Sequence, residues 1–188
     1  MTNIHPVNYG LLRKMAKIHS AEWLRQRHDI DHILFGRKDK NQMIYVRFKK
    51  LTDTAVTPTK GSAFAAGYDL YADTDREIVV EPGDTVPFCT GIAMEIPDGY
   101  CGKIYSRSGL STKYGICLAN GVAIIDTDFR GNIRIPMHNE SDKPFTVMPH
   151  ERLAQIIIEK VPEVMFYECD ELTETDRGDG GFGSSGRV

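Results

Sequence analysis

An apolar run that ends in two carboxylates is the segment of the sequence best suited to chemistry. The segment "NGVAIIDTDFRGNI" extends from Asn120 to Ile133 and places Asp126 directly after the run, with Asp128 two residues later. An aromatic residue, Phe129, and a Gly turn follow. A carboxylate held at the edge of a buried element can act as a general base that takes a proton from an attacking water.

Two other kinds of site built on paired aspartates fit the surrounding residues poorly. An EF-hand calcium loop that starts at Asp126 needs a Glu eleven residues later, and Met137 occupies that position. A retroviral-type aspartic protease has Gly after Asp-Thr, and Asp128 stands there instead. The general-base interpretation of Asp126 is therefore favoured.

A loop rich in hydroxyl groups and glycine offers contacts for phosphate. The segment "YSRSGLSTKYGI" contains Arg107, Ser108 and Gly109 in succession. A guanidinium can donate two N–H groups to a phosphate while a hydroxyl and neighbouring backbone amides bind other oxygens. Upstream, "AAGYDLYA" places Asp69 two residues after Gly67. Taken singly, each of these short patterns is also compatible with an ordinary turn.

Taken together, five segments resemble the five motifs of the trimeric deoxyuridine triphosphatase (dUTPase) family. In order they are "AAGYDLYA", "SRSGLSTK", "NGVAIIDTDFRG", "ERLAQIII" and "RGDGGFGSSG", and the likeness covers roughly residues 43–188. The resemblance implies an all-β fold, a jelly-roll-like or distorted β-barrel, assembled as a homotrimer with shared active sites. It also implies Mg²⁺-dependent hydrolysis of dUTP to dUMP and pyrophosphate, which removes dUTP and supplies dUMP for thymidylate synthesis.

The resemblance assigns roles position by position. Asp126 orients and deprotonates the water that attacks the α-phosphorus, and Asp69 holds hydrated Mg²⁺ through water. Phe129 stands where the family usually has Tyr, and it packs under the deoxyribose so that a 2′-hydroxyl is excluded by volume. Arg152 is assigned a structural role. The other substrate-binding residues implied are Arg107, Ser108, Gly109 and Gln155 for the phosphates, and Asn120, Gly121 and Ala123 in a hairpin whose backbone reads uracil.

The C-terminal segment "RGDGGFGSSGRV" cannot build a core of its own, because it consists largely of Gly and Ser. The resemblance implies a lid that closes over the site of a neighbouring subunit. Phe182 then stacks on uracil, Arg177 reaches the terminal phosphate, and the triphosphate is lined by Gly183, Ser184 and Ser185. Two departures from the common motifs are Ser106, where Pro is usual, and Ala123, where Gly is usual.

Two alternative functions fit parts of the sequence. A dCTP deaminase shares the fold but has a Glu shortly after the turn that ends at Gly131, and here the first Glu is Glu140. A dUTPase-fold regulator could instead bind protein or nucleic acid through the basic N-terminal extension. Residues 1–50 hold eleven Lys or Arg against four Asp or Glu, although the whole chain has a net charge of −3.

Strand patterns dominate the chain from Met43 onward. The segment "IYVRFKK" alternates apolar and polar residues, and the Ile-rich "ERLAQIIIEKV" favours a buried strand that ends at Pro162. Turn sequences separate these runs, which predicts a barrel or sandwich. The predicted organisation is a basic, partly helical extension at 1–42, a β-barrel at 43–170 and a mobile Gly-rich lid at 171–188.

Composition sets the remaining expectations. The chain has 188 residues and four cysteines without C-x-x-C spacing, so structural zinc is not expected. No apolar run approaches the roughly 18 residues of a membrane span. We expect a cytoplasmic protein with no membrane partner, and organelle targeting by residues 1–42 is the alternative.

Overall fold

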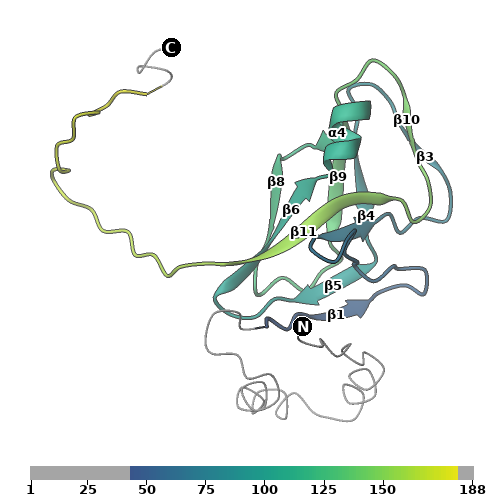
Figure 1. Ribbon diagram of the computed structural model, residues 1–188, viewed down its shortest axis with the longest axis horizontal. Coiled ribbons are helices and arrows are strands. Elements are labelled where there is room, and N and C mark those ends of the chain that lie inside the picture. The colour runs from purple at the N-terminus through teal and green to yellow at the C-terminus, as the bar shows by residue number, and fades with distance from the viewer. Residues whose placement is uncertain (1–42, 182–188) are drawn as a thin grey trace, which may run out of the picture. The chain divides into compact units, whose positions relative to one another are not determined.

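Within the described part of the chain, the fold consists of short antiparallel strands and one short helix (Figure 1). The computed structural model describes residues 43–181. The elements are β1 (Arg47–Lys50), β2 (Tyr68–Tyr71), β3 (Ile78–Val80), β4 (Thr85–Cys89), β5 (Ile92–Glu95), β6 (Tyr100–Ser106), α4 (Ser108–Tyr114), β7 (Ile116–Leu118), β8 (Val122–Ile125), β9 (Arg134–Asn139), β10 (Phe145–Val147) and β11 (Arg152–Lys160).

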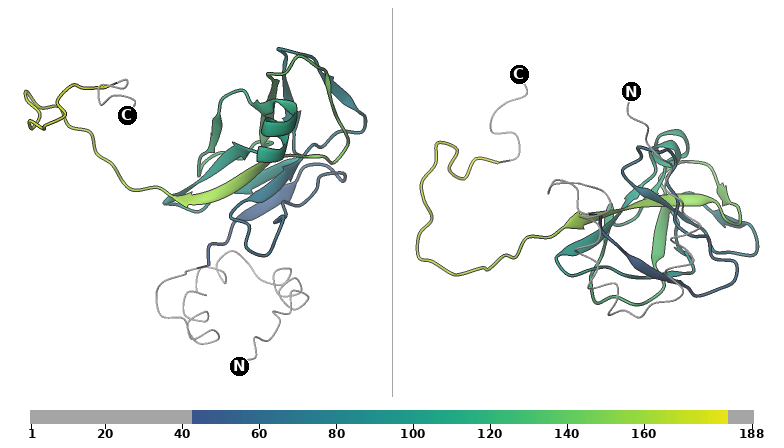
Figure 2. Two further views of the ribbon diagram at one scale, coloured as in Figure 1. Left: turned by 45° about the horizontal axis from the view of Figure 1, so that its top comes forward. Right: turned by 60° about the horizontal axis from the view of Figure 1, so that its bottom comes forward.

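The described strands form four small sheets, and every strand pair is antiparallel. The largest sheet has the order β2-β11-β6-β8, and a second has the order β4-β9-β7. The pairs β1-β5 and β10-β3 complete the body. Figure 2 shows the strands wrapped around a common interior. This arrangement confirms the predicted all-β, barrel-like fold.

Branched aliphatic side chains fill the interior between the sheets. Ile104 and Ile156 face each other across the β6–β11 pair, and Leu70, Ile135 and Met137 are as fully buried. Such residues pack well on a pleated surface, which explains why the Ile-rich segment forms the strand β11 rather than a helix. The predicted strand over 44–50 is shorter than expected, since β1 starts only at Arg47.

The sequence patterns did not predict the helix α4. It has seven residues, which is too short for a clear period of 3.6, and only Leu110 is buried. The helix is followed by Gly115, whose φ of 66° places it in the left-handed region and lets its N–H group bond back into the last turn. Gly115 was the residue in the sequence that could have indicated the end of a helix.

Several predictions concern residues that the structure does not describe. The helical extension over 1–42 and the lid residues Phe182, Gly183, Ser184 and Ser185 lie outside the described range. Between β11 and Gly181 the described chain contains no helix or strand. Within residues 43–181 no helix is long and apolar enough to cross a membrane.

Candidate active site

Asp69 lies at the centre of an ionic cluster that joins three parts of the chain. Its side chain is only 11% exposed, and it accepts contacts from two guanidinium groups. Arg107 Nε lies 3.3 Å from Oδ1, and Arg152 Nη1 lies 3.2 Å from Oδ2. Arg107 Nη1 also donates to the backbone carbonyl of Arg152 at 2.9 Å. The predicted metal residue and the predicted phosphate residue are therefore brought together.

Gln155 belongs to the same end of the four-stranded sheet. In the strand register it lies opposite Asp69 on β2 and opposite Tyr105 on β6. Its side-chain amide donates to the carbonyl of Ser106 at 3.3 Å. Gly67 makes room for this side chain, because a Cβ at position 67 would lie 2.9 Å from Gln155 Oε1. Ser108 and Gly109 follow immediately as the first residues of α4.

Ser106, one of the departures from the common motif, has a specific contact. Its hydroxyl oxygen accepts a hydrogen bond from the backbone N–H of Leu118 at 2.9 Å. Proline has no side-chain oxygen and could not make this bond. The serine therefore ties the start of the phosphate loop to the strand that leads into the predicted uracil-binding segment.

The predicted uracil hairpin is not a paired hairpin in this structure. β7 pairs with β9 and β8 pairs with β6, so residues 119–121 form a turn between two different sheets. Gly121 adopts a φ of 68° there, and its N–H group donates to the carbonyl of Leu118 at 3.0 Å. Asn120 is exposed in the turn, and Ala123 lies half-buried in β8 opposite Ile104.

Asp126 follows β8 in an exposed loop. The backbone N–H of Phe129 donates to the Asp126 carbonyl at 3.3 Å and closes a turn. The guanidinium of Arg130 donates to the carbonyls of Thr127 and Phe129, which orders the same turn. Phe129 is 40% exposed, and its ring lies beside Gly131.

The strand register separates Asp126 from the ionic cluster around Asp69. Val122 lies opposite Tyr105, near the Arg107 end of β6, whereas Ile125 lies opposite Gly102. Asp126 is one residue further along and therefore lies near the level of Cys101. Cys101 precedes Arg107 by six residues. At about 3.3 Å per residue, the two backbone positions are on the order of 20 Å apart. One copy of the chain does not place the predicted base beside its own predicted phosphate ligands.

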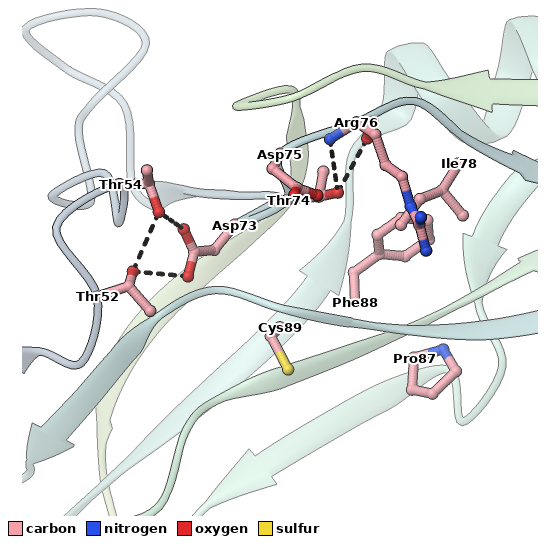
Figure 3. Close-up of a pocket in the computed structure, with 10 residues that line it drawn as sticks. All are labelled: Thr52, Thr54, Asp73, Thr74, Asp75, Arg76, Ile78, Pro87, Phe88 and Cys89. Atoms are coloured by element: carbon pink, nitrogen blue, oxygen red, sulfur yellow. Dashed lines mark hydrogen bonds between the residues drawn. The ribbon is translucent and has the colours of Figure 1, made fainter.

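A pocket of about 430 Å³ is lined by none of the predicted site residues. Figure 3 shows the residues that line it. On one side of the pocket, the Asp73 carboxylate accepts hydrogen bonds from the hydroxyls of Thr52 and Thr54, both at 2.7 Å. These contacts satisfy the carboxylate and tie the loop after β1 to the segment after β2.

A second ionic group lies on the outer face of the large sheet. Lys103 Nζ lies 2.6 Å from Glu159 Oε2, and the Tyr105 hydroxyl donates to Glu159 Oε1 at 3.2 Å. Hydrogen bonding to Lys103 lowers the pKa of Glu159, and the same bond raises the pKa of Lys103. Burial, followed by the nearby Glu159 charge, raises the pKa of Tyr105.

The residues around Asp69 fit a hydrated magnesium ion better than a directly ligated one. No group of three or more His, Cys, Asp or Glu side chains gathers as a metal site within the described residues. Mg²⁺ keeps several waters and commonly takes only one or two carboxylates together with substrate phosphates. A carboxylate has about four lone-pair positions, so two arginine contacts leave room on Asp69 for bound water.

Among the lid residues predicted to bind substrate, Arg177 is the one that the structure describes. It is exposed, and its Nε donates to the carbonyl of Gly180 at 2.8 Å in a local turn. The N–H group of Gly180 in turn donates to the Arg177 carbonyl at 3.0 Å. Within the described residues, Arg177 is not brought to Asp69 or Arg107.

Comparison with known proteins gives one consistent family. The dUTPase family model matches residues 53–186. The deoxyuridine 5′-triphosphate nucleotidohydrolase of Desulfitobacterium hafniense is 44% identical over 148 residues, which cover 78% of this chain and 96% of that protein. The enzyme of the same name from Syntrophotalea carbinolica is 43% identical over 143 residues, covering 76% and 97%.

Solved structures support the same assignment. The dUTPase of Staphylococcus bacteriophage 80alpha with dUPNHPP aligns with a TM-score of 0.69 and 26% identity, covering 76% of this chain and 98% of that one. A mutant dUTPase from phage phi11 of S. aureus, 22% identical with a TM-score of 0.62, shares the fold and is described with a structural Mg(II) ion. The family match, the relatives and the barrel together show that this chain belongs to the dUTPase family.

Proposed function

We propose that this chain is a dUTP diphosphatase, which hydrolyses dUTP to dUMP and pyrophosphate by attack of water on the α-phosphorus. The observation that carries the proposal is the family match over residues 53–186, with relatives of that activity at 44% identity. The convergence of Asp69, Arg107 and Gln155 supplies a charged end of the site suited to a triphosphate. The deaminase alternative is not favoured, because a deaminase has a Glu shortly after Gly131. Here the first Glu after that turn is Glu140, which lies beyond the end of β9.

In the proposed mechanism, Asp126 orients the attacking water and accepts its proton. General-base assistance contributes roughly 10²–10⁴-fold, which corresponds to about 3–5 kcal/mol of the barrier. The larger share comes from aligning the triphosphate and neutralising the charge that develops on it. Arg107 carries positive charge in a rigid fork, and Ser108 adds a hydroxyl donor beside it.

The proposed cofactor is Mg²⁺, held by Asp69 through bound water rather than by direct ligation. When bound, the ion neutralises the phosphate oxygens and orients the triphosphate. Asp69 is nearly buried and fixed by two arginines, so its carboxylate presents a preformed acceptor. Gln155 lies next to Asp69 in the register and adds an amide directed at the same end of the sheet.

We propose that the complete site forms between copies of the chain in a homotrimer. The separation between Asp126 and Arg107 within one copy supports this proposal, in which one copy supplies the base and another the phosphate ligands. Apolar side chains available for such contacts are exposed on β8, where Val122 and Ile124 are 41% and 52% exposed. Further along, Met165 and Phe166 are 87% and 95% exposed. Large apolar surface of this kind is typical of subunit interfaces.

Selectivity for dUTP would arise at three places. The backbone of the turn and β8, from Asn120 to Ala123, would pair with the hydrogen-bonding edge of uracil and mismatch cytosine. The Phe129 ring would occupy the space that a 2′-hydroxyl needs. We propose that Arg177 and Phe182 close the site over the triphosphate and the base.

A nucleotide panel tests the proposed function. The purified full-length chain is incubated with dUTP, dCTP, dTTP and UTP, with Mg²⁺ or with a chelator, and pyrophosphate and the nucleoside monophosphate are quantified. We expect dUMP and pyrophosphate in equal amounts from dUTP alone, and a severe loss of turnover with the chelator. Release of ammonia from dCTP, or equal turnover of all four nucleotides, would contradict the proposal.

A further inference from the structure

Arg152, the first residue of β11, contacts both Asp69 and Arg107. Its side chain contacts Asp69 Oδ2 at 3.2 Å, and its backbone carbonyl accepts the Nη1 donor of Arg107 at 2.9 Å. One residue therefore holds both the predicted metal residue and the predicted phosphate ligand. Its own side chain is 47% exposed, so little of its surface is used to fill the core.

The backbone around Arg152 is shaped to place it there. The register between β11 and β2 shifts between Arg152 and Ala154, as in a β-bulge. Bulges re-aim a side chain and are common beside active sites. His150, two residues earlier, adopts a φ of 58°, which is uncommon for a residue other than glycine. A hydrogen bond from the backbone N–H of Ala72 to the Glu151 carbonyl at 2.8 Å holds the backbone of this segment in place.

These contacts form a closed network of three residues from three elements. Arg107 follows β6, Asp69 lies in β2 and Arg152 begins β11. Arg107 makes two contacts in this network, with the Asp69 carboxylate and with the Arg152 carbonyl. Asp69 makes two contacts as well, one on each carboxylate oxygen. Removing the Arg152 side chain frees one oxygen of Asp69, and the other is then held by Arg107 alone.

We propose that Arg152 is a positioning residue for the metal-and-phosphate end of the site. Its guanidinium fixes the orientation in which Asp69 presents oxygen to hydrated Mg²⁺, and its carbonyl keeps Arg107 beside the incoming triphosphate. Arg152 does not touch the reacting atoms. The inference rests on the proposed function, since it gives Arg152 a role toward the Mg²⁺-bound triphosphate.

The test compares Arg152→Gln and Arg152→Lys with the wild type and with a matched control. The control is Arg47→Gln, which removes another arginine–carboxylate contact, that of Arg47 with Glu95 at 2.9 Å on β1 and β5. For each full-length protein, kcat, KM and the Mg²⁺ concentration for half-maximal turnover are measured. Binding of the non-hydrolysable analogue dUPNHPP, with Mg²⁺ and with a chelator, is measured by calorimetry, and dUMP binding serves as a second probe.

We expect Arg152→Gln to weaken Mg²⁺-dependent dUPNHPP binding about tenfold and to raise the half-maximal Mg²⁺ concentration several-fold, since both depend on an oriented Asp69. Affinity for dUMP and the melting temperature should stay close to those of the wild type. Arg152→Lys should recover part of the loss, and Arg47→Gln should lose nothing.

Two results would overturn the inference. One is unchanged analogue binding and an unchanged Mg²⁺ requirement in Arg152→Gln. The other is a uniform loss of dUMP binding, analogue binding and melting temperature, which would mean that Arg152 serves the fold alone. If the wild type bound the Mg²⁺–analogue complex without turning over dUTP, the proposed function would fail while the binding comparison still tested Arg152.

Discussion

The ring of Phe129 lies directly against Gly131, so that a Cβ at position 131 would come within 2.8 Å of the ring Cζ. The absence of a side chain at position 131 therefore allows the ring to lie where it does. Phe129 is 40% exposed and does not belong to the buried core. Gly131 thereby affects the position of the Phe129 ring, which is proposed to exclude ribonucleotides.

Gly131→Ala is expected to displace the Phe129 ring while leaving the fold intact. We expect the ratio of kcat/KM for dUTP over UTP to fall about tenfold, in line with the loss of one well-packed apolar contact. Steady-state kinetics with both nucleotides measure it. In a Phe129→Ala background the same change should have no further effect, and an equal loss in both backgrounds would show that the ring is not involved.

Asp126→Asn is expected to lower kcat by roughly 10²–10⁴-fold, because an amide cannot accept the proton of the attacking water. Binding of dUPNHPP should persist, since the side chain keeps its size. Asp128→Asn is the matched control, an exposed carboxylate two residues away in the same loop. Turnover retained by Asp126→Asn, or lost equally in both variants, would contradict the assignment.

Mixing two inactive variants tests whether the site is shared. Asp126→Asn keeps a functional Arg107, and Arg107→Gln keeps a functional Asp126. If each site draws these residues from different copies, co-refolding at equal amounts should restore about a quarter of wild-type turnover, because a quarter of randomly assembled sites hold both. The mass of the assembly is followed by light scattering. No recovery in mixed assemblies would place both residues of one site in the same chain.

The Glu159 contacts predict the dependence of stability on pH. The pKa of Glu159 is lowered in the folded chain, so its contribution is present above the ordinary Glu value of about 4.3 and is lost as pH falls through the folded value. The pKa of Lys103 is raised, so its contribution is lost only as pH rises through its folded value, above about 10.4.

Glu159→Gln should therefore flatten the acid side of the stability profile. Denaturant unfolding from pH 3 to pH 8, at one protein concentration, should show a smaller fall in the free energy of unfolding for the variant than for the wild type. Glu163→Gln, an exposed acid beyond β11, is the control and should follow the wild type. Superimposable profiles for Glu159→Gln and wild type would refute the prediction.

Truncation after Asp176 is expected to leave folding intact and reduce turnover severely. The barrel strands end at Lys160, whereas the proposed clamp residues begin at Arg177. Loss of a single base–aromatic stack costs about 1–3 kcal/mol, roughly a 10- to 100-fold decrease in affinity. Circular dichroism checks the fold, and kcat/KM for dUTP checks the site. Near-normal activity of the shortened chain would mean that the tail is dispensable.

The sequence by itself determined the family, the all-β class and the chemical types of the site residues. Five short motifs in order were specific in combination, and the Ile-rich segment after Glu151 correctly indicated a strand. The seven-residue helix α4 was missed because its length gives no usable periodicity. The predicted uracil hairpin was wrong as a paired hairpin, because local sequence does not specify that β7 and β8 pair with different partners.

Only the tertiary structure decided which of these residues meet. Strand pairing joins positions far apart in the chain, and register determines which of them share an end of the sheet. That register places Gln155 beside Asp69 and carries Asp126 to the opposite end of β6. The sequence named the chemical groups of the site. Their distribution between the two ends of one sheet, on which the proposal of a site shared between copies rests, follows from pairings that no local pattern encodes.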